Sequence, residues 1–180
     1  AKSGNSVEVK FDFLHAVPPQ TTPDWLKKTK IVNETGFVNV DSNTLQHVKY
    51  KNIWSLGDCS SLPTSRTAAA ITGQTPVLVN NLLTVWRDKA KNPQFAQYYG
   101  YTSCPILIGE NNLLLAEFNY KNEPEETLGA LGLQDKPRTM FYLLTRYGFL
   151  FAYFNLLPRG LWYGRSLVLP PVLKKAPPKA

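Results

Sequence analysis

The fold is decided by the stretch Asn52-Ile53-Trp54-Ser55-Leu56-Gly57-Asp58-Cys59, which is followed by Thr64-Ser65-Arg66-Thr67-Ala68-Ala69-Ala70-Ile71. The apolar run stops at Gly57 and Asp58, crosses a short polar loop and resumes in an Ala-rich segment. This pattern predicts a strand, a tight turn and the N-terminus of a helix. Gly57 has no Cβ, so another backbone or a ligand can approach it closely. Asp58 places a carboxylate at the carboxyl end of the strand, where open α/β sheets usually bind ligands.

The start of this helix is the second local feature with a chemical meaning. Unpaired N–H groups at a helix N-terminus favour a phosphate or an electron-rich ring edge. Taken locally, however, the same residues also fit a plain turn that binds nothing, and both interpretations stay open at this point.

Length and composition limit the class of protein. The chain has 180 residues, 43% of them hydrophobic, which suits one ordinary core and excludes a disordered protein. The formal net charge is +7, and it is unevenly spread. Two lysine clusters carry much of it: Lys27, Lys28 and Lys30, and Lys174, Lys175 and Lys179. Such charge suits nucleic acid or an anionic membrane surface. No nucleic-acid-binding signature accompanies it, so no nucleic-acid partner is expected.

The cysteine content indicates a reducing compartment. Cys59 and Cys104 are the two cysteines of the sequence, too few for a disulfide framework. The chain begins without a signal-peptide pattern. No metal site is expected.

Local patterns predict the elements around the central stretch. Alternation of apolar and polar residues predicts a strand over Val7–Phe13. Further strands are expected over 36–40 and 53–56, with a short helix or turn over 23–28. A long helix is expected over 68–86, kinked or divided at Pro76. A hairpin is expected from 104–109 and 113–120, with Cys104 at its entry. His15 is expected to be hydrogen-bonded at a strand end, and His47 to lie on the surface.

The composition changes in the last part of the chain. Residues 139–173 are rich in aromatic and apolar side chains, but no uninterrupted stretch reaches the ~18–20 residues of a membrane span. Aromatic faces near Trp162 and Tyr163, with basic residues such as Arg159 and Arg165, suit helices that lie at a membrane surface. A buried helical pair that closes the core is the alternative.

Several motifs together resemble one family. The Gly-Asp turn is similar to the second flavin-binding motif of the two-dinucleotide-domain flavoproteins, and the whole chain resembles their eukaryotic mitochondrial sulfide:quinone oxidoreductases. The motifs are Leu14–Pro19, Leu45–His47, Gly57–Cys59 with Leu62–Ser65, Gly100–Pro105, Ala116–Phe118 and the aromatic tail. The resemblance covers nearly the whole sequence.

The resemblance implies a cofactor and a set of site residues. FAD is the expected cofactor, with Asp58 on a ribityl hydroxyl and Gly57 at the same turn. Arg66 stands where relatives commonly have Lys, and its planar guanidinium makes the carried-over role less direct. Cys104 occupies the position of the second redox cysteine, in the same Tyr-Thr-Ser-Cys-Pro context. Its partner lies upstream in the family, and Cys59 is not part of the redox pair.

The resemblance also implies a reaction and a location. Hydrogen sulfide would be oxidised to a protein-bound persulfide, and electrons would pass through FAD to ubiquinone. Glutathione or sulfite would accept the sulfur, and the enzyme would be peripheral to the mitochondrial inner membrane. Two residues, Gly73 and Gln74, are candidates for the quinone side of the flavin. Candidates for the quinone channel are Phe149, Phe151, Tyr153 and Phe154.

The expected fold class is α/β, the C-terminal part of a Rossmann-like FAD/NAD(P)-binding flavoprotein with a β hairpin and an amphipathic helical tail. The expected parts are 1–50, the end of a second nucleotide-type domain and the return to the FAD domain; 51–92, the FAD-domain Gly-Asp strand and helix; 93–137, the Cys-bearing hairpin and connection; and 138–180, the membrane-associating tail. The sequence lacks the G-x-G-x-x-G fingerprint that an FAD enzyme needs. It is therefore expected to be a C-terminal portion of a longer protein and inactive alone.

Two other readings remain open. Another quinone-linked flavoprotein, such as a type II NADH dehydrogenase, would share the Gly-Asp motif without needing Cys104. A non-catalytic, basic module that binds a membrane surface would need neither feature.

Overall fold

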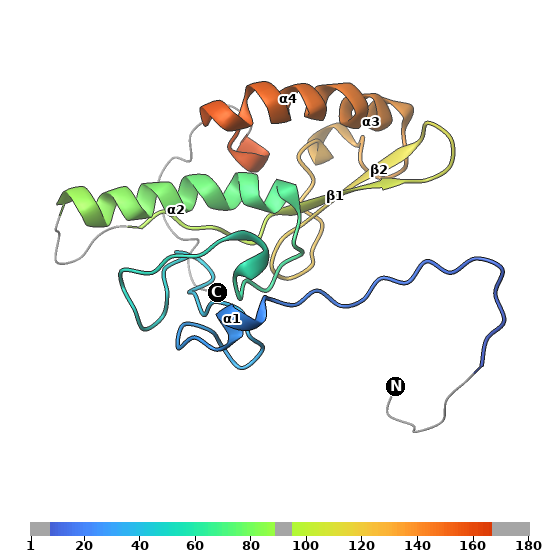
Figure 1. The fold of residues 1–180 in the computed structure, drawn as a ribbon. Helices are drawn as coiled ribbons and strands as arrows, with labels where there is room; N and C mark the ends of the chain where they lie inside the picture. Colours follow the sequence, from blue (N-terminus) through green and yellow to red (C-terminus); the bar gives the residue numbers. More distant parts are fainter. Residues whose placement is uncertain (1–7, 89–94, 167–180) are drawn as a thin grey trace.

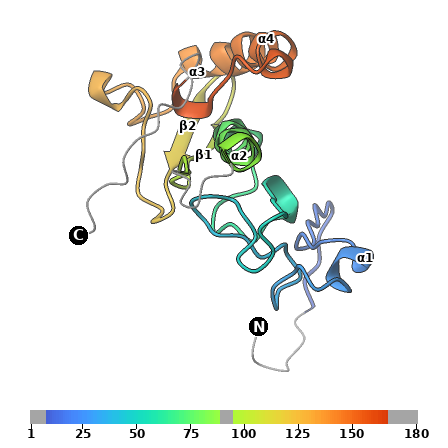
Figure 2. The same ribbon diagram turned by 90° about the vertical axis from the view of Figure 1, so that its left-hand side faces the viewer.

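The computed structural model describes residues 8–88 and 95–166, in a mixed arrangement of helices and one two-stranded antiparallel sheet (Figures 1 and 2). In chain order the elements are α1 (Asp24–Lys27), η1 (Gly57–Cys59), α2 (Ala68–Asp88), β1 (Thr102–Leu107), β2 (Leu113–Phe118), η2 (Gly129–Leu131), α3 (Thr139–Leu143), η3 (Leu144–Phe149), α4 (Leu150–Asn155), η4 (Leu157–Arg159) and η5 (Gly164–Ser166). Helix α2 runs through the middle, between a loop-rich region and the hairpin with its helices.

The loop-rich region below α2 in Figure 1 is built from turns and single bridges. The short helix predicted over 23–28 is confirmed as α1. The strands predicted over 36–40 and 53–56 are wrong, because these segments form only isolated bridges, such as Val40 with His47 and Gln46 with Trp54. A turn that is fixed by the Asp41 carboxylate, which accepts the N–H of Thr44 at 2.8 Å, reverses the chain before a ladder can extend.

The prediction of a surface position for His47 is also wrong. Its side chain is 2% exposed. The ring nitrogen Nδ1 accepts the N–H groups of Lys49 and Tyr50 at 2.9 and 3.0 Å. Nε2 therefore carries the proton and donates to the carbonyl of Ile31 at 3.0 Å. The histidine links the turn at Lys49 and Tyr50 to the backbone at Ile31.

The N-terminal segment departs from the predicted strand. Of the predicted Val7–Phe13, the described residues 8–13 form no strand, and Phe13 is 86% exposed. A strand exists only when its N–H and C=O groups pair with a neighbour, and no segment of the described chain lies alongside (Figure 1). His15, expected at a strand end, is exposed in the same segment.

Helix α2 confirms the predicted long helix. The Thr67 hydroxyl caps it by accepting the N–H of Ala70 at 3.0 Å. A kink or a division was predicted at Pro76. The division is wrong, because α2 is one continuous helix across this residue, and the kink stays a prediction. Val77 and Leu78, directly after the proline, pack into the apolar core of the loop-rich region. This packing stabilises the helix directly after the residue that lacks an N–H.

The predicted hairpin is confirmed. Strands β1 and β2 pair in antiparallel register, with Cys104 opposite Ala116. Cys104 is the third residue of β1 rather than its entry, because pairing already begins at Thr102. One face of the hairpin packs on Phe141 of α3, which is 0% exposed, so the tail is anchored to the sheet.

The tail forms a single rod of three consecutive helices, α3, η3 and α4, that lies over the hairpin (Figure 1). One side of the rod is buried through Phe141, whereas many of its other apolar side chains are exposed. The exposed ones are Met140, Leu143, Leu144, Tyr147, Leu150, Phe151, Tyr153 and Phe154. No helix in the described ranges is long and apolar enough to cross a membrane. The lysine cluster at 174–179 lies outside the described residues.

Candidate functional site

The Gly57-Asp58 corner is held against helix α2. Gly57 has φ +67°, a left-handed conformation that favours glycine, and its N–H donates to the Gln74 side-chain oxygen at 2.8 Å. The Ser60 hydroxyl donates to the Gly57 carbonyl at 2.6 Å. With its backbone fixed in this way, the turn presents the Asp58 side chain to solvent. No hydrogen bond engages that carboxylate within the described residues, so it is free to accept one.

Arg66 lies at the same corner. Its Nε donates to the Asp58 carbonyl at 3.1 Å, and its guanidinium stacks over the Phe37 ring at 4.1 Å. The predicted cofactor residues Gly57, Asp58 and Arg66 are therefore brought together by two elements, η1 and the loop that precedes α2.

The first turn of α2 adds backbone donors. Thr67 satisfies the N–H of Ala70, but the N–H groups of Ala68 and Ala69 have no acceptor among the residues that the structure describes. Such donors, together with the positive end of the helix dipole, favour an anionic or electron-rich group.

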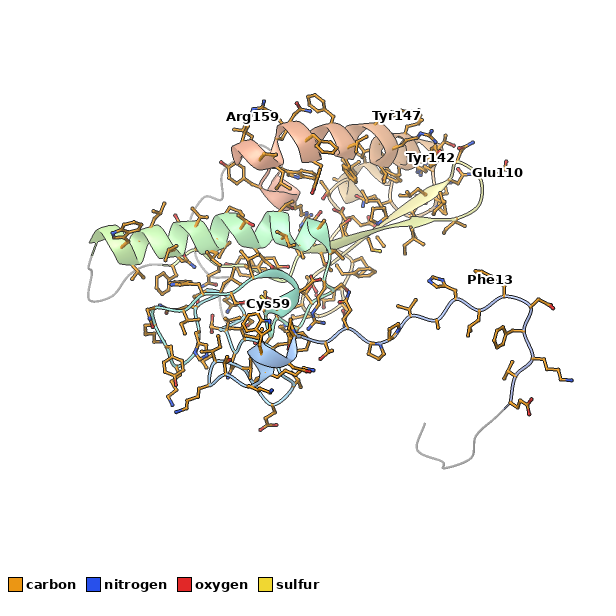
Figure 3. All side chains as sticks on the ribbon, in the orientation of Figure 1. Phe13, Cys59, Glu110, Tyr142, Tyr147 and Arg159 are labelled. Atoms are coloured by element: carbon orange, nitrogen blue, oxygen red, sulfur yellow. The ribbon has the colours of Figure 1, made fainter. Side chains whose placement is uncertain are left out.

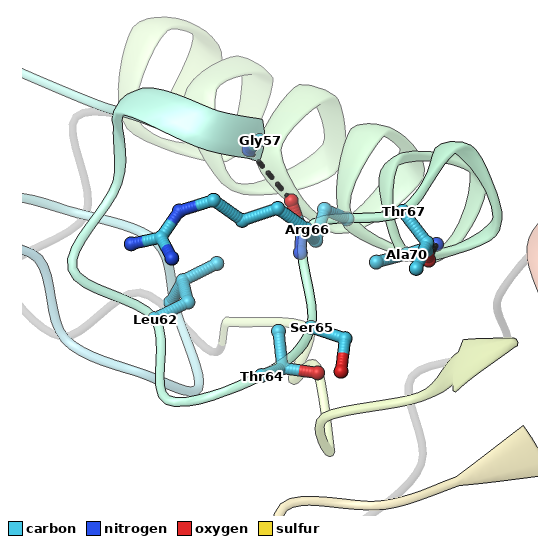
Figure 4. Close-up of a pocket in the computed structure, with 8 residues that line it drawn as sticks. Gly57, Leu62, Thr64, Ser65, Arg66, Thr67 and Ala70 are labelled. Carbon is cyan, nitrogen blue, oxygen red and sulfur yellow. Dashed lines mark hydrogen bonds between the residues drawn. The ribbon is translucent and has the colours of Figure 1, made fainter. Parts of the chain in front are cut away.

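A small cavity of about 10 Å³ lies between the corner and α2 (Figure 4). Its lining residues are Gly57, Leu62, Thr64, Ser65, Arg66, Thr67, Ala70 and Gln74. This volume is enough for about one water molecule. A cofactor at the corner must therefore lie on its outer surface, where the Asp58 carboxylate is exposed.

A much larger cavity of about 680 Å³ lies on the other side of the α2 N-terminus. It is open to solvent on one side and is bordered by the first turns of α2, the hairpin, the connection after β2 and the tail rod. The start of α2 contributes the capping Thr67 with Ala68, Ala69 and Thr72. The hairpin region contributes Tyr101, Ser103, Cys104, Pro105, Leu115 and Glu117, and the connection contributes Thr127 and Leu128. The tail contributes Leu144, Thr145, Arg146, Phe149, Leu150, Tyr153, Leu157, Trp162, Gly164 and Arg165. A mainly apolar wall with a few polar groups and this volume are typical of small-molecule sites.

The two cysteines occupy different environments. Cys104 contributes to the wall of the large cavity. Cys59 lies in η1, on the side of α2 that faces away from the tail rod (Figure 3), where its thiol donates to the Leu56 carbonyl and lies 3.3 Å from the Ser55 hydroxyl. Both thiols are free and exposed. Cys104 is therefore the cysteine that a molecule in the large cavity can meet.

The return segment after the tail rod closes the cavity against α2. A Cβ placed on Gly164 would lie 3.0 Å from the Gly73 Cα, so the two backbones pack directly against each other. Arg165 fixes the segment by donating to the Glu125 carboxylate at 2.6 Å and to the Glu126 carbonyl at 2.9 Å. Gly73 and Gln74 were predicted on the quinone side of the flavin, and that role stays a prediction. Gly73 packs against Gly164, and the Gln74 side chain accepts the N–H of Gly57.

Glu117 is a site residue that the sequence reasoning missed. Its side chain is 4% exposed and lines the large cavity. Four donors satisfy its carboxylate: the Tyr101 hydroxyl at 2.6 Å, the Thr127 N–H and hydroxyl at 2.6 and 2.9 Å, and the Gln134 amide at 2.8 Å. Burial and the neighbouring carboxylate raise the pKa of the Tyr101 hydroxyl, which stays protonated as the donor. The sequence did contain a signal for a buried Glu117. Alternate residues of a strand share one face, so Glu117 was expected on the same face of β2 as the apolar Leu113 and Leu115.

The predicted quinone-channel residues divide into two groups. Phe149 and Tyr153 line the large cavity. Phe151 and Phe154 do not contribute to its wall and are 61% and 64% exposed. Within residues 8–88 and 95–166, no three His, Cys, Asp or Glu side chains gather to hold a metal ion.

Comparison with known proteins identifies close relatives. No protein-family model matches the chain. Over 172 residues it is 45% identical to a protein of Schizosaccharomyces pombe named mitochondrial sulfide:quinone oxidoreductase, covering 93% of this chain and 37% of that protein. The proteins of the same name from Dictyostelium discoideum and Mus musculus are 44% and 39% identical, and the match covers 91% and 93% of this chain. The chain spans about a third of the length of these relatives (37%, 35% and 36%).

A solved structure contains a chain of similar fold. It is a cryo-EM structure of the Tetrahymena thermophila mitochondrial ATP synthase, in which one chain matches with a TM-score of 0.63 and 28% identity. The match covers 87% of this chain and 35% of that one.

Proposed function

We propose that this chain, a homologue of the mitochondrial sulfide:quinone oxidoreductases along about a third of their length, contributes to a flavoprotein that oxidises hydrogen sulfide and passes the electrons to a quinone. The observation that carries the proposal is the position of Cys104 on the wall of a large apolar cavity that begins at the first turn of α2. The resemblance to this family, inferred from the motifs, is confirmed by identities of 39–45%. The test is sulfide-dependent flavin reduction in the complete protein that carries this sequence, with and without Cys104.

The residues at the Gly57-Asp58 corner fit FAD as the cofactor. The exposed Asp58 carboxylate can accept a hydrogen bond from a ribityl hydroxyl, and the free N–H groups of Ala68 and Ala69 can donate to an electron-rich edge. Arg66 adds a positive charge beside them. When bound, FAD supplies a two-electron acceptor for the thiolate and a two-electron donor for the quinone. In this proposal residues 51–92 belong to a Rossmann-like FAD domain and residues 1–50 to the return from a second nucleotide-type domain.

The sulfur chemistry assigns a role to Cys104. Sulfide attacks a disulfide between Cys104 and a second cysteine, the S–S bond breaks, and one cysteine keeps the incoming sulfur as a persulfide while the other leaves as a thiolate. The two electrons of sulfide thus reside on that thiolate, and they would pass to the flavin when the two cysteines re-form their disulfide after the outer sulfur has left. Cys59 lies outside the cavity, so the second cysteine must come from another part of the protein. A small acceptor such as glutathione or sulfite then takes the persulfide sulfur.

The apolar part of the cavity is the proposed quinone site. Phe149, Tyr153 and Trp162 form an aromatic wall there, which suits a ubiquinone ring. The hairpin and connection, residues 93–137, supply the opposite wall and Cys104.

The exposed face of the tail supports a peripheral position on the mitochondrial inner membrane, where a ubiquinone can enter from the lipid. The relatives are named mitochondrial, and the described part of the tail, residues 138–166, exposes aromatic side chains next to Arg146 and Arg159. Apolar and aromatic groups beside basic residues are typical of helices that lie at a lipid surface.

Replacing both Phe151 and Phe154 by serine is expected to weaken membrane binding by about 10-fold or more, because each exposed ring would otherwise be buried in lipid. Co-sedimentation of the complete protein with anionic phospholipid vesicles measures the effect. Trp25→Ser removes an equally exposed aromatic ring from α1 and should leave binding unchanged. Equal loss in both variants would show that the tail has no special role.

Replacing Asp58 by alanine is expected to weaken FAD retention by about 10-fold, because one hydrogen bond to a carboxylate is lost. Asp58→Asn keeps an oxygen acceptor and should retain more cofactor. The measurement is the flavin absorbance that remains after exhaustive dialysis. An unchanged spectrum for Asp58→Ala would remove Asp58 from the proposed flavin site.

Two alternatives predict different behaviour. A type II NADH dehydrogenase would reduce its flavin with NADH and would not depend on Cys104. A non-catalytic role draws support from the fold match to a chain in the ATP synthase structure, although that identity is 28% against 39–45% for the oxidoreductases. The sequence that precedes this chain in the complete protein separates these cases. A G-x-G-x-x-G fingerprint with a distant cysteine favours sulfide oxidation, and a fingerprint without that cysteine favours NADH oxidation. The absence of both favours the non-catalytic role.

A further inference from the structure

The middle of the tail rod contains a π-helical turn, η3, between α3 and α4. Helices of this kind are rare, occur mostly as short interruptions of α-helices and are frequent at functional sites. In a π-helix the backbone hydrogen bonds reach one residue further than in an α-helix, so a side chain near the turn meets a different set of carbonyl oxygens.

Thr145, the second residue of η3, has an unusual hydroxyl. On helix α2, the hydroxyls of Thr75 and Thr84 donate to the carbonyl oxygens four residues earlier, both at 2.8 Å. The Thr145 hydroxyl oxygen is also buried, yet it has no hydrogen-bond partner within the described residues. A buried and unpaired polar group lowers stability, so its presence calls for an explanation.

The position of Thr145 suggests that explanation. The residue contributes to the wall of the 680 Å³ cavity, between Leu144 and Arg146. Threonine in a helix has two favoured χ1 positions, and rotation between them exchanges the methyl group and the hydroxyl. A ligand that fills the cavity with an acceptor oxygen near this wall would give the hydroxyl the partner that it lacks.

Three other side chains on the wall already donate hydrogen bonds within the protein. Arg146 donates to the Tyr142 hydroxyl at 2.6 Å, and Arg165 donates to Glu125. The Tyr101 hydroxyl donates to Glu117. The Thr145 hydroxyl can therefore bond to a ligand without breaking an existing contact.

We propose that Thr145 is a binding residue of the cavity, whose hydroxyl donates a hydrogen bond to a ring carbonyl oxygen of the quinone. This inference rests on the proposed function, because it takes a quinone as the occupant of the cavity. The ring carbonyls of a quinone only accept hydrogen bonds, and the aromatic wall formed by Phe149 and Trp162 would hold the ring itself.

The test compares Thr145→Val, which keeps the shape and removes the hydroxyl, with Thr145→Ser, which keeps the hydroxyl. Binding of a short-chain ubiquinone to the complete protein is followed by quenching of tryptophan fluorescence, since Trp162 lines the cavity. The Kd is expected to rise about 3- to 10-fold in Thr145→Val and to stay within about 2-fold in Thr145→Ser. Without ligand, Thr145→Val should be at least as stable as wild type, because it loses an unpaired hydroxyl.

Thr84→Val is the matched control, because it removes a hydroxyl that is satisfied within α2 and lies away from the cavity wall. It should leave the Kd unchanged. Sulfide-dependent flavin reduction should be equal in wild type and Thr84→Val. Wild-type affinity in Thr145→Val, or no quinone binding by the wild type, would overturn the assignment. If sulfide did not reduce the flavin of the wild-type protein, the proposed function itself would be overturned.

Discussion

Replacing Cys104 by serine in the complete protein is expected to reduce the rate of sulfide-dependent flavin reduction on the order of 10³-fold or more, while the FAD content stays near one per chain. Serine cannot form the disulfide that sulfide attacks, so neither the persulfide nor the thiolate can arise. The hairpin should tolerate the change, because Cys104 is exposed and its backbone pairing with Ala116 does not depend on the sulfur. Rapid mixing with sulfide under anaerobic conditions measures the rate.

The sequence offers a matched control in Cys59. This thiol is equally free, but it lies at η1 and contacts the Ser55 hydroxyl and the Leu56 carbonyl rather than the cavity. Cys59→Ser should therefore keep nearly wild-type flavin reduction by sulfide. Normal turnover in Cys104→Ser, or loss of turnover in Cys59→Ser alone, would contradict the assignment of the redox cysteine.

Replacing Glu117 by alanine is expected to lower the free energy of unfolding by about 3–5 kcal/mol. The change removes the acceptor of four hydrogen bonds and leaves the donors of Tyr101, Thr127 and Gln134 unpaired in a buried place. Glu117→Gln should lie between wild type and Glu117→Ala, because the amide keeps one acceptor oxygen but turns an NH₂ group toward donors. Urea unfolding of the three proteins measures the differences.

Glu123 provides the control for this experiment. It is an exposed glutamate of the same connection, with a hydrogen bond from Asn119 at 3.1 Å, so Glu123→Ala should change the unfolding free energy by no more than about 0.5 kcal/mol. If Glu117→Ala unfolded within about 1 kcal/mol of wild type, the carboxylate would not be what fixes the connection to the hairpin.

Local signals in the sequence predicted the elements that depend on local chemistry. The apolar stripe that predicted α2 and the two β-rich runs that predicted the hairpin are examples. The strand predicted over Val7–Phe13 failed for a different reason: its alternating pattern is real, but pairing requires a neighbour that the described chain does not supply. His47 could not be predicted as buried, because its three backbone partners come from turns that no periodicity reveals.

The sequence predicted part of the candidate site, as it predicted part of the fold. The motif placed Gly57, Asp58 and Arg66 together, and they do share one corner, but their role toward FAD stays a prediction. The burial of Glu117 could have been predicted, because the alternating pattern of β2 places it on the same face as Leu113 and Leu115. The free hydroxyl of Thr145 was not, because it depends on a π-helical turn, and no residue pattern in the tail distinguishes that turn from an ordinary helix.

The most direct test of the central claim mixes the complete protein anaerobically with sulfide and then with a short-chain ubiquinone, while the visible absorbance of the flavin is followed. The proposed function requires that sulfide bleaches the flavin absorbance and that the quinone restores it. A flavin that sulfide leaves oxidised but NADH bleaches, or a complete protein that binds no flavin, would contradict it.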